Sequence, residues 1–274
     1  MKSFHSRTPK ARTPIGVGAP PAAPVRRGQR ADALLVTLGL APSRTAAQRL
    51  IEAGRVFADG VAVVKPAQEL PANVALHIVA DTDDRYISRG GLKLAGALAH
   101  TGLDVHGCVC LDVGQSTGGF TDCLLQAGAA RVVGVDVGHG QLHPRLRSDV
   151  RCVCIEGCNA RALDAAALGS HYPACGFDLI VADASFISLT LLLPQLPPLL
   201  APGGDMLLLV KPQFEVGPEH VGRGGIVKDA TLYPQVEAKL RAACAAAHLV
   251  VHDWFDSPIT GGDGNREFFL WISR

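Results

Sequence analysis

Residues 110–120, which read Cys-Leu-Asp-Val-Gly-Gln-Ser-Thr-Gly-Gly-Phe, decide the fold of this 274-residue chain. The stretch begins with the apolar pattern of a buried strand, and glycines follow where the strand must turn. Glycine allows a ligand to approach the backbone, and the helix predicted after the turn would present free N–H groups to it. The spacing differs from the G-x-G-x-x-G of dinucleotide-binding proteins, because Gly114 is followed four residues later by Gly118 and Gly119.

Apolar strands alternate with helical stretches on both sides of this turn. Continuous apolar strands separated by helices indicate a parallel sheet that is covered on both faces. The last two strands lie close in sequence, and we expect them to form an antiparallel pair at one side of the sheet. The strands are predicted at 108–113, 132–137, 150–155, 177–182, 206–210, 250–255 and 268–272, and the helices near 91–102, 119–127, 187–200 and 231–247. This α/β pattern predicts a Rossmann-like, seven-stranded domain with the layout of S-adenosylmethionine (SAM)-dependent methyltransferases.

Two carboxylates at strand ends favour SAM over NAD as the cofactor. Asp112 lies at the end of the first strand, where it would repel a pyrophosphate but would suit a cationic or zwitterionic ligand. Asp136 ends the next strand, where a carboxylate can bind ribose hydroxyls. A dinucleotide remains the alternative. The residues expected to contact the cofactor are Asp112, Gly114, Ser116, Thr117, Gly118, Gly119, Phe120, Asp136, Val137, Gln141, Asn159 and Asp183, with Glu156 near its adenosine end.

Further charged residues follow the later strands of the predicted sheet. Asp183 ends the strand at 177–182, Lys211 ends the strand at 206–210, and Glu267 opens the last strand. Ligands of open α/β sheets bind in the crevice outside the carboxyl ends of the strands, so these side chains are candidates for chemistry. Structural ion pairs are the alternative, although a lysine directly after Leu-Leu-Leu-Val is unusual in a core.

The near-neutral net charge of +1 conceals a basic N-terminal part. Residues 1–95 contain 14 Lys and Arg against 7 Asp and Glu, whereas the remaining residues contain 12 against 18. Residues 1–28, rich in Pro, Ala, Arg and Gly, are predicted to be a disordered basic tail. The asymmetry indicates that the N-terminal part contacts a polyanion while the rest has another role.

Residues 29–84 are predicted to form a small α+β domain. Leu34, Leu35 and Leu38 share one helical face that ends at Gly39, and Ser43 is a candidate N-cap for a second helix ending at Gly54. Two short strands flank the Asp59-Gly60 turn, and residues 74–79 could add another. The module resembles the S4 RNA-binding domain through Gly39-Leu-Ala-Pro-Ser43-Arg44, Ala47, Leu50-Ile51, Gly54-Arg55-Val56, Asp59-Gly60 and Val64-Lys65-Pro66, although Asp59 stands where that family usually has Asn.

The resemblance implies an RNA-binding surface on this module. The residues expected to contact RNA are Arg30, Arg44, Arg49, Arg55 and Lys65, together with Arg89 just beyond the boundary. Arginines on or near the second helix could face phosphates together. A solvated helix face is the alternative. The second domain is placed at 85–274, after the acidic stretch from Asp81 to Asp84.

The whole chain from about residue 29 resembles the TlyA family, also called hemolysin A. The resemblance rests on six ordered motifs: Asp84-Arg-Tyr-Ile-Ser-Arg-Gly-Gly-Leu-Lys93-Leu, Asp112-Val-Gly-Gln-Ser-Thr-Gly-Gly-Phe-Thr-Asp122, Val135-Asp136-Val-Gly-His-Gly-Gln-Leu, Asp183-Ala-Ser-Phe-Ile-Ser, Val210-Lys211-Pro-Gln-Phe-Glu and Gly264-Asn-Arg-Glu267. It implies an S4 domain before an FtsJ-like methyltransferase domain, and ribosomal RNA (cytidine-2′-O)-methyltransferase activity with SAM. Gln115 departs from the pattern, because a small residue is usual there and a larger one could crowd the cofactor.

The family's Lys-Asp-Lys-Glu tetrad falls on Lys93, Asp183, Lys211 and Glu267. In a partly buried, cationic neighbourhood, Lys211 is expected to accept the proton of a ribose 2′-hydroxyl or to orient its lone pair. Lys93 would supply the neighbouring cation, and the two carboxylates would fix the lysines. Alignment of the hydroxyl with the methyl group is expected to contribute most of the catalysis.

Other classes of protein fit the sequence less well. No secretory signal is visible in Met1 to Arg30, and prolines interrupt the apolar stretch from Ala184 to Gly204, which predicts a core helix and turn and not a membrane span. The eight cysteines contain no C-x-x-C, and His139 and His143 lie in a Gly- and Pro-rich loop, so no metal site is expected. We therefore expect a cytoplasmic monomer that acts on ribosomal RNA or ribosomal subunits.

Three points remain open on the sequence. A non-catalytic RNA-binding or ribosome-assembly factor is the main alternative, and a membrane-active hemolysin is a second. The chain ends soon after the last predicted strand, which favours large-subunit (23S) rRNA over a dual specificity that includes 16S rRNA.

Overall fold

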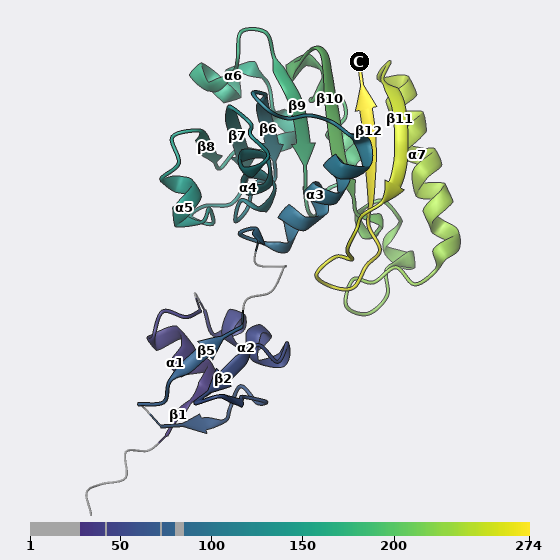
Figure 1. The fold of residues 1–274 in the computed structure, drawn as a ribbon. Helices are drawn as coiled ribbons and strands as arrows, with labels where there is room; N and C mark the ends of the chain where they lie inside the picture. Colours follow the sequence, from purple (N-terminus) through teal and green to yellow (C-terminus); the bar gives the residue numbers. More distant parts are fainter. Residues whose placement is uncertain (1–27, 42, 72, 80–84) are drawn as a thin grey trace, which may run out of the picture. The chain divides into compact units, whose positions relative to one another are not determined.

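The computed structural model describes residues 28–41, 43–71, 73–79 and 85–274, and it divides the chain into two compact units (Figure 1). The units are residues 1–80 and 81–274. The predicted boundary after residue 84 and most of the predicted tail, residues 1–27, lie outside the described residues.

The first unit is a small α+β domain. Its helices are α1 (Ala31–Thr37) and α2 (Arg44–Glu52), and the Ser43 Oγ caps α2 by accepting a hydrogen bond from the Ala46 N–H at 3.2 Å. β2 (Val56–Ala58) pairs with both β3 (Val61–Ala62) and β5 (Leu76–Ile78), while β1 (Gln29–Arg30) pairs with β4 (Glu69–Leu70). Asp59 and Gly60 both have a positive φ in the turn between β2 and β3, as the Asp-Gly signal predicted.

The second unit is built on a seven-stranded sheet with the order β11-β12-β10-β9-β6-β7-β8. Five neighbouring strands are parallel, and β12 runs antiparallel to both of its neighbours. The strands are β6 (Val109–Val113), β7 (Arg131–Asp136), β8 (Cys152–Glu156), β9 (Phe177–Ala182), β10 (Leu200–Val210), β11 (Val250–Asp256) and β12 (Phe268–Ser273). The seven predicted strands are therefore confirmed, with ends that shift by a few residues, most at β10.

Helices cover both faces of this sheet, and each face has its own apolar core. One face packs against α3 (Arg89–Thr101), α4 (Gly119–Gln126) and α5 (Pro144–Arg147) through residues such as Leu94, Leu124 and Leu146. The other packs against α6 (Ala165–Leu168) and α7 (Tyr233–Ala246) through Leu168 and Leu240. Both cores meet strand residues buried on opposite sides of the sheet, as a doubly covered parallel sheet requires.

The predicted helix at 187–200 is wrong. The structure has two short 3₁₀ turns there, at Leu189–Leu191 and Pro197–Leu199. The leucines of this segment other than Leu191 are buried, but Pro194, Pro197 and Pro198 lack the N–H groups that a continuous helix needs. Among the described residues, no helix is long and apolar enough to span a membrane.

Candidate active site

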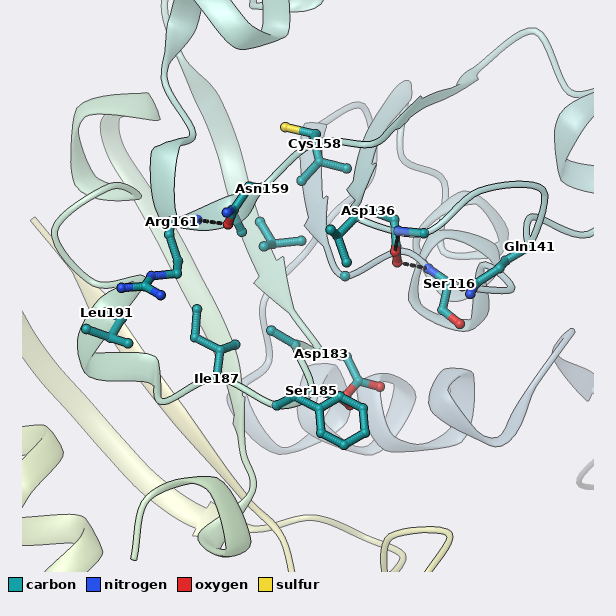
Figure 2. A pocket seen from close by; sticks show the side chains of 18 of the residues that line it. Ser116, Asp136, Gln141, Cys158, Asn159, Arg161, Asp183, Ser185, Ile187 and Leu191 are labelled. Atoms are coloured by element: carbon teal, nitrogen blue, oxygen red, sulfur yellow. Dashed lines mark hydrogen bonds between the residues drawn. The ribbon is translucent and has the colours of Figure 1, made fainter. Parts of the chain in front are cut away.

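A cavity of about 670 Å³ lies at the carboxyl ends of the parallel strands (Figure 2). Its walls come from the loops after β6, β7, β8 and β9, as expected for the crevice of an open α/β sheet. The lining residues are Val113, Gly114, Ser116, Val135, Asp136, Val137, Gly138, Gln141, Cys158, Asn159, Ala160, Arg161, Asp183, Ala184, Ser185, Phe186, Ile187, Ser188 and Leu191.

Asp136 organises one end of this cavity, together with Ser116 and Gln141 (Figure 2). Its Oδ2 accepts a hydrogen bond from the Ser116 N–H at 2.7 Å, and its Oδ1 accepts one from the Gly138 N–H at 2.7 Å. These bonds hold two loops around the carboxylate, including Ser116 with its left-handed φ of 49°. Because each carboxylate oxygen has more than one lone pair, Asp136 can still accept hydrogen bonds from ribose hydroxyls.

Gly114 is the glycine that the cavity requires. It has a φ of 84°, and a Cβ there would lie 2.8 Å from the Asp183 carbonyl oxygen. The loops after β6 and β9 can therefore approach each other only with glycine at this position.

The glycine pair that follows packs helices and does not line the cavity. A side chain on Gly118 would overlap Leu146 of α5, and one on Gly119 would overlap Ser88 at the start of α3. Phe120 is buried and stacks on Phe269 with ring centroids 6.3 Å apart. Thr117 is exposed, and none of Thr117, Gly118, Gly119 and Phe120 lines the cavity, so their expected contact with a cofactor stays a prediction.

Asp112 is also enclosed within the domain and does not reach the cavity. Its Oδ2 accepts a hydrogen bond from the Thr121 Oγ1 at 2.6 Å, and its Oδ1 has no hydrogen-bond partner among the described residues. Burial raises the pKa of this carboxyl to about 7. Asp112 is not among the lining residues, and its contact with a cofactor stays a prediction.

Gln115 does not crowd the cavity, contrary to the expectation from its size. Its side chain is buried, and its Nε2 donates to the Thr121 Oγ1 at 2.9 Å. The amide occupies the space where a side chain on Gly134 of β7 would lie. Asp112, Thr121 and Gln115 therefore form one buried polar network, and Gly134 provides the room for it.

Two lysine–carboxylate pairs meet at the same edge of the sheet. The Lys211 Nζ lies 2.6 Å from the Asp183 Oδ1, and the Lys93 Nζ lies 2.5 Å from the Glu267 Oε2. Lys211 also donates to the Ser185 Oγ at 2.7 Å. Each lysine therefore has a carboxylate as its immediate neighbour, so the set is balanced in charge and is not the simple cationic neighbourhood that was expected.

Sheet topology brings Asp183, Lys211 and Glu267 together, and Lys93 reaches Glu267 from α3. Asp183 and Lys211 follow the adjacent parallel strands β9 and β10. β12 is antiparallel to β10 and its first residue, Phe268, pairs with Val210, which places Glu267 beside Lys211. Burial raises the pKa of Glu267. The positive charges of Lys93 and Lys211 oppose that rise, because both lysines lie close enough to stabilise its carboxylate.

Several cavity residues were not among the predicted site residues, although Ser185, Phe186 and Ile187 belong to the motif that begins at Asp183. Ser185 binds Lys211, and Phe186 is 91% exposed with a left-handed φ of 64° while its ring lies 5.2 Å from that of Phe214. Figure 2 shows Arg161, Leu191 and Ile187 at the end of the cavity opposite Ser116. An exposed aromatic residue with positive φ is a structural property that periodicity and motif spacing do not reveal.

Two of the three residues expected at the adenosine end of the cofactor lie in the wall of the cavity. Gln141 and Asn159 line the cavity. Glu156 does not, because its Oε1 accepts hydrogen bonds from the Gly140 N–H at 2.8 Å and from Arg147 at 3.3 Å. The nearby His143 caps α5, and the described residues contain no cluster of three or more His, Cys, Asp or Glu side chains that could hold a metal ion.

In the first unit, two of the predicted RNA-binding arginines pair with one buried carboxylate. Arg30 and Arg44 pair with Asp32 at 2.8 and 3.0 Å, and these bonds hold the pKa of Asp32 well below its usual range. Both guanidinium groups remain about half exposed, whereas Asp32 is fully buried. Arg55 donates to the Val79 carbonyl at 2.9 Å, and Arg49 and Lys65 are exposed. Arg89 belongs to the second unit and donates to the Thr260 carbonyl at 2.9 Å.

Comparison with known proteins decides the family. Residues 86–274 match the family model of FtsJ-like methyltransferases, and residues 29–75 match the S4 domain. The 16S/23S rRNA (cytidine-2′-O)-methyltransferase TlyA of Mycobacterium tuberculosis is 47% identical over 250 residues, which cover 90% of each chain. The chain belongs to the TlyA family.

Other members of the TlyA family show the same relationship. The 23S rRNA (cytidine-2′-O)-methyltransferase TlyA of Campylobacter jejuni is 34% identical over 69% of this chain and 71% of its own. A solved structure from Streptococcus thermophilus that is named as a hemolysin has a TM-score of 0.71 and 38% identity, and the match covers 90% of this chain and 89% of that one. The TlyA family and its S4 and FtsJ-like domains, both expected from the six motifs, are confirmed.

Proposed function

We propose that this protein transfers the methyl group of SAM to the 2′-hydroxyl of a cytidine in ribosomal RNA, most of all in the large subunit. The meeting of Lys93, Asp183, Lys211 and Glu267 beside the cavity is the observation that carries the proposal. Asp183 belongs to both the charged set and the cavity wall, so a cofactor in the cavity would lie next to the proposed reacting groups. Membership of the TlyA family supports the same reaction.

The residues of the cavity fit SAM in size and in charge. A volume of about 670 Å³ falls within the range of cavities that bind small molecules. Asp136 would bind the ribose hydroxyls, and Gln141 and Asn159 would contact the adenosine end. The carboxylates of Asp136 and Asp183 suit a positively charged ligand. SAM supplies an electrophilic methyl group on a sulfonium, which leaves as a neutral thioether.

The Lys211–Asp183 pair is suited to handling the hydroxyl proton. An ammonium has three donors. Lys211 donates one hydrogen bond to Ser185 and forms an ion pair with Asp183, so an N–H remains that can point at the 2′-oxygen and orient the hydroxyl. As the O–C bond forms, Lys211 would pass a proton to Asp183 and take the hydroxyl proton, so the pair acts as one acceptor. Lys93 and Glu267 would hold the neighbouring charge fixed, and alignment would supply most of the rate.

The acceptor nucleotide would reach this site over an exposed aromatic side chain. Phe186 is the exposed ring on the cavity wall, and bases of single-stranded nucleic acid stack on such rings. A ribose 2′-hydroxyl is accessible when its nucleotide is splayed out of the stack. Arg30, Arg44 and Arg49, which form the basic face of the S4 domain, would hold the surrounding RNA by its phosphates.

The decisive experiment uses the full-length protein, methyl-labelled SAM, and unmodified 50S and 30S ribosomal subunits. We expect label in 23S rRNA, and mapping of 2′-O-methylation should place it on one cytidine. Label in both subunits would extend the substrate to 16S rRNA. Binding of the subunits without any transfer would contradict the proposal and would identify a non-catalytic RNA-binding factor.

A further inference from the structure

A second charged cluster lies behind the cavity wall and does not touch the proposed reacting groups. Its centre is Glu215, which follows Lys211 by four residues and whose side chain is 1% exposed. The Glu215 Oε1 accepts a hydrogen bond from the Leu189 N–H at 2.7 Å, and its Oε2 accepts one from the Ser188 Oγ at 2.6 Å. Lys239 of α7 donates to the same Oε2 at 2.9 Å and to the Glu215 carbonyl at 2.8 Å.

These bonds hold a part of the cavity wall that has little regular structure of its own. Residues 183–188 and Leu191 line the cavity, and the segment continues into a single 3₁₀ turn at Leu189–Leu191. It is tied to the segment after β10 at two points. Lys211 bonds to Ser185 at the first, and Glu215 bonds to Ser188 and Leu189 at the second.

The backbone between the two ties is strained. Phe186 has a φ of 64°, which is unusual for an aromatic residue, and its ring is almost fully exposed. A conformation of this kind persists when the surrounding structure holds it in place. The ring contacts Phe214 at 5.2 Å between centroids but stays 91% exposed, so this contact restrains it little and the ties on either side of Phe186 and Ile187 add to the restraint.

The charges of the cluster explain why its carboxylate can remain buried. An isolated carboxylate in the interior is costly unless it is paired and hydrogen-bonded. Glu215 has a counter-ion in Lys239, whose side chain remains 43% exposed, and two further donors on the cavity wall. The Glu215 carboxylate therefore accepts hydrogen bonds from the Ser188 hydroxyl, the Leu189 N–H and Lys239 of α7, and it does not line the cavity.

We infer that Glu215 is a positioning residue for methyl transfer. It touches neither cofactor nor substrate, and it fixes the 183–191 wall so that Asp183, Ser185 and Phe186 stand in the geometry that binds SAM and the acceptor nucleotide. This inference rests on the proposed methyl transfer, but its effect on cofactor binding does not require turnover.

The test compares Glu215→Gln and Lys239→Gln with Glu237→Gln in the full-length protein. Gln at position 215 keeps an acceptor for the Leu189 N–H but offers an NH₂ group where Ser188 and Lys239 donate. Glu237 is a matched control, because it pairs with Arg241 at 2.8 Å on α7 and takes no part in the cluster. Four quantities are measured: the Kd for S-adenosylhomocysteine by calorimetry, kcat and KM on ribosomal subunits, and the midpoint of thermal unfolding.

We expect Glu215→Gln to weaken S-adenosylhomocysteine binding about tenfold, as loss of charged hydrogen bonds predicts. It should lower kcat/KM on the order of 10²-fold, because small misplacements of reacting groups have that effect. Lys239→Gln should lie between this variant and the wild type, and Glu237→Gln should match the wild type. A lower unfolding midpoint with unchanged Kd, kcat and KM in the Glu215 and Lys239 variants would overturn the inference. Inactive wild-type protein would refute the proposed function, and the binding measurement would still decide the role of Glu215.

Discussion

The amide of Gln115 occupies the space that a side chain on Gly134 would need. Gln115 follows β6 and Gly134 lies in the middle of the neighbouring β7, so the two positions are coupled across the sheet. Gln115 reaches Thr121 through this space, and Thr121 reaches the buried Asp112. Gly134 therefore makes room for the side chain of Gln115, which comes from the turn after β6, and Gly134 itself is not part of a turn.

This coupling predicts the behaviour of a double variant. Gly134→Ala should destabilise the second domain by about 1–3 kcal/mol, because an added methyl group overfills a packed interior. Gln115→Ala should also destabilise it, since Thr121 loses a donor. The double variant should be more stable than the sum of the two effects, because the new methyl group fills part of the space left by the amide. Urea unfolding of the four proteins measures this, and strict additivity would show that the two sites are independent.

The charged set predicts a separation of binding from catalysis. Lys211→Ala removes the group proposed to orient the 2′-oxygen and to relay its proton, but it leaves the Asp136 end of the cavity unchanged. Because the Ser185 tie is lost, we expect S-adenosylhomocysteine affinity to fall by no more than about tenfold. Methyl transfer should fall at least about 10²-fold, the usual contribution of a general acid–base group. Arg241→Ala, an exposed change on α7, is the control. Near-normal transfer by Lys211→Ala would remove Lys211 from the mechanism.

The buried carboxyl of Asp112 predicts a pH-dependent stability. Burial raises the pKa of Asp112 from 3.8, the value of an unperturbed aspartate, to about 7, so between these values the folded protein holds a proton that the unfolded chain has released. The stabilising contribution is therefore present at low pH and is lost as the pH rises through about 7. The difference in unfolding free energy between wild type and Asp112→Asn should fall as the pH rises from about 4 to 8.

Asp149→Asn provides a control of opposite sign for that measurement. The Arg151 guanidinium lowers the pKa of Asp149, so its contribution is present above the unfolded value and is lost as the pH falls. Its effect should therefore be level in the range where that of Asp112 changes. A flat difference for Asp112→Asn across the neutral range would show that Asp112 stays charged in the folded protein.

The basic face of the S4 domain predicts a steep dependence of RNA binding on salt. Arg49→Ala should weaken binding to every RNA tested and should reduce the slope of log K against log salt by about 1, because one phosphate contact is lost. Arg49 lies on α2 and is exposed. Filter binding or fluorescence anisotropy between low and moderate salt gives the slope, and Arg241→Ala should leave it unchanged. An unaltered slope for Arg49→Ala would place the RNA on another face.

The sequence was sufficient for the sheet because its strands are runs of apolar residues that end at chemically distinct positions. Asp136, Asp183 and Lys211 each follow such a run, and parallel strands bring their carboxyl ends together. Leucine spacing misled the interpretation of residues 187–200, since three prolines oppose the helix that the leucines favour.

The roles within the glycine-rich turn could not be separated from sequence. Glycines with different roles have the same letter in a sequence. Gly114 lines the cavity and lets the loops after β6 and β9 approach each other, whereas Gly118 and Gly119 make room for Leu146 and Ser88. The resemblance to the TlyA family indicated the four charged residues, but the pairing of Lys93 with Glu267 was seen only in the structure. Ser185 and Phe186 were missed because their positions depend on a loop that Glu215 holds through contacts distant in sequence.

The antiparallel course of β12 places Glu267 beside Lys93 and Lys211, so this group of charged residues is complete only when β12 is in the sheet. All residues that line the cavity precede position 192, whereas Glu267 joins Lys93 only when β12 has inserted between β10 and β11. During synthesis, a nascent chain can complete its cofactor cavity before the fourth charged group has emerged. The cavity and the charged set therefore differ in which strands they need, because only the charged set requires β12.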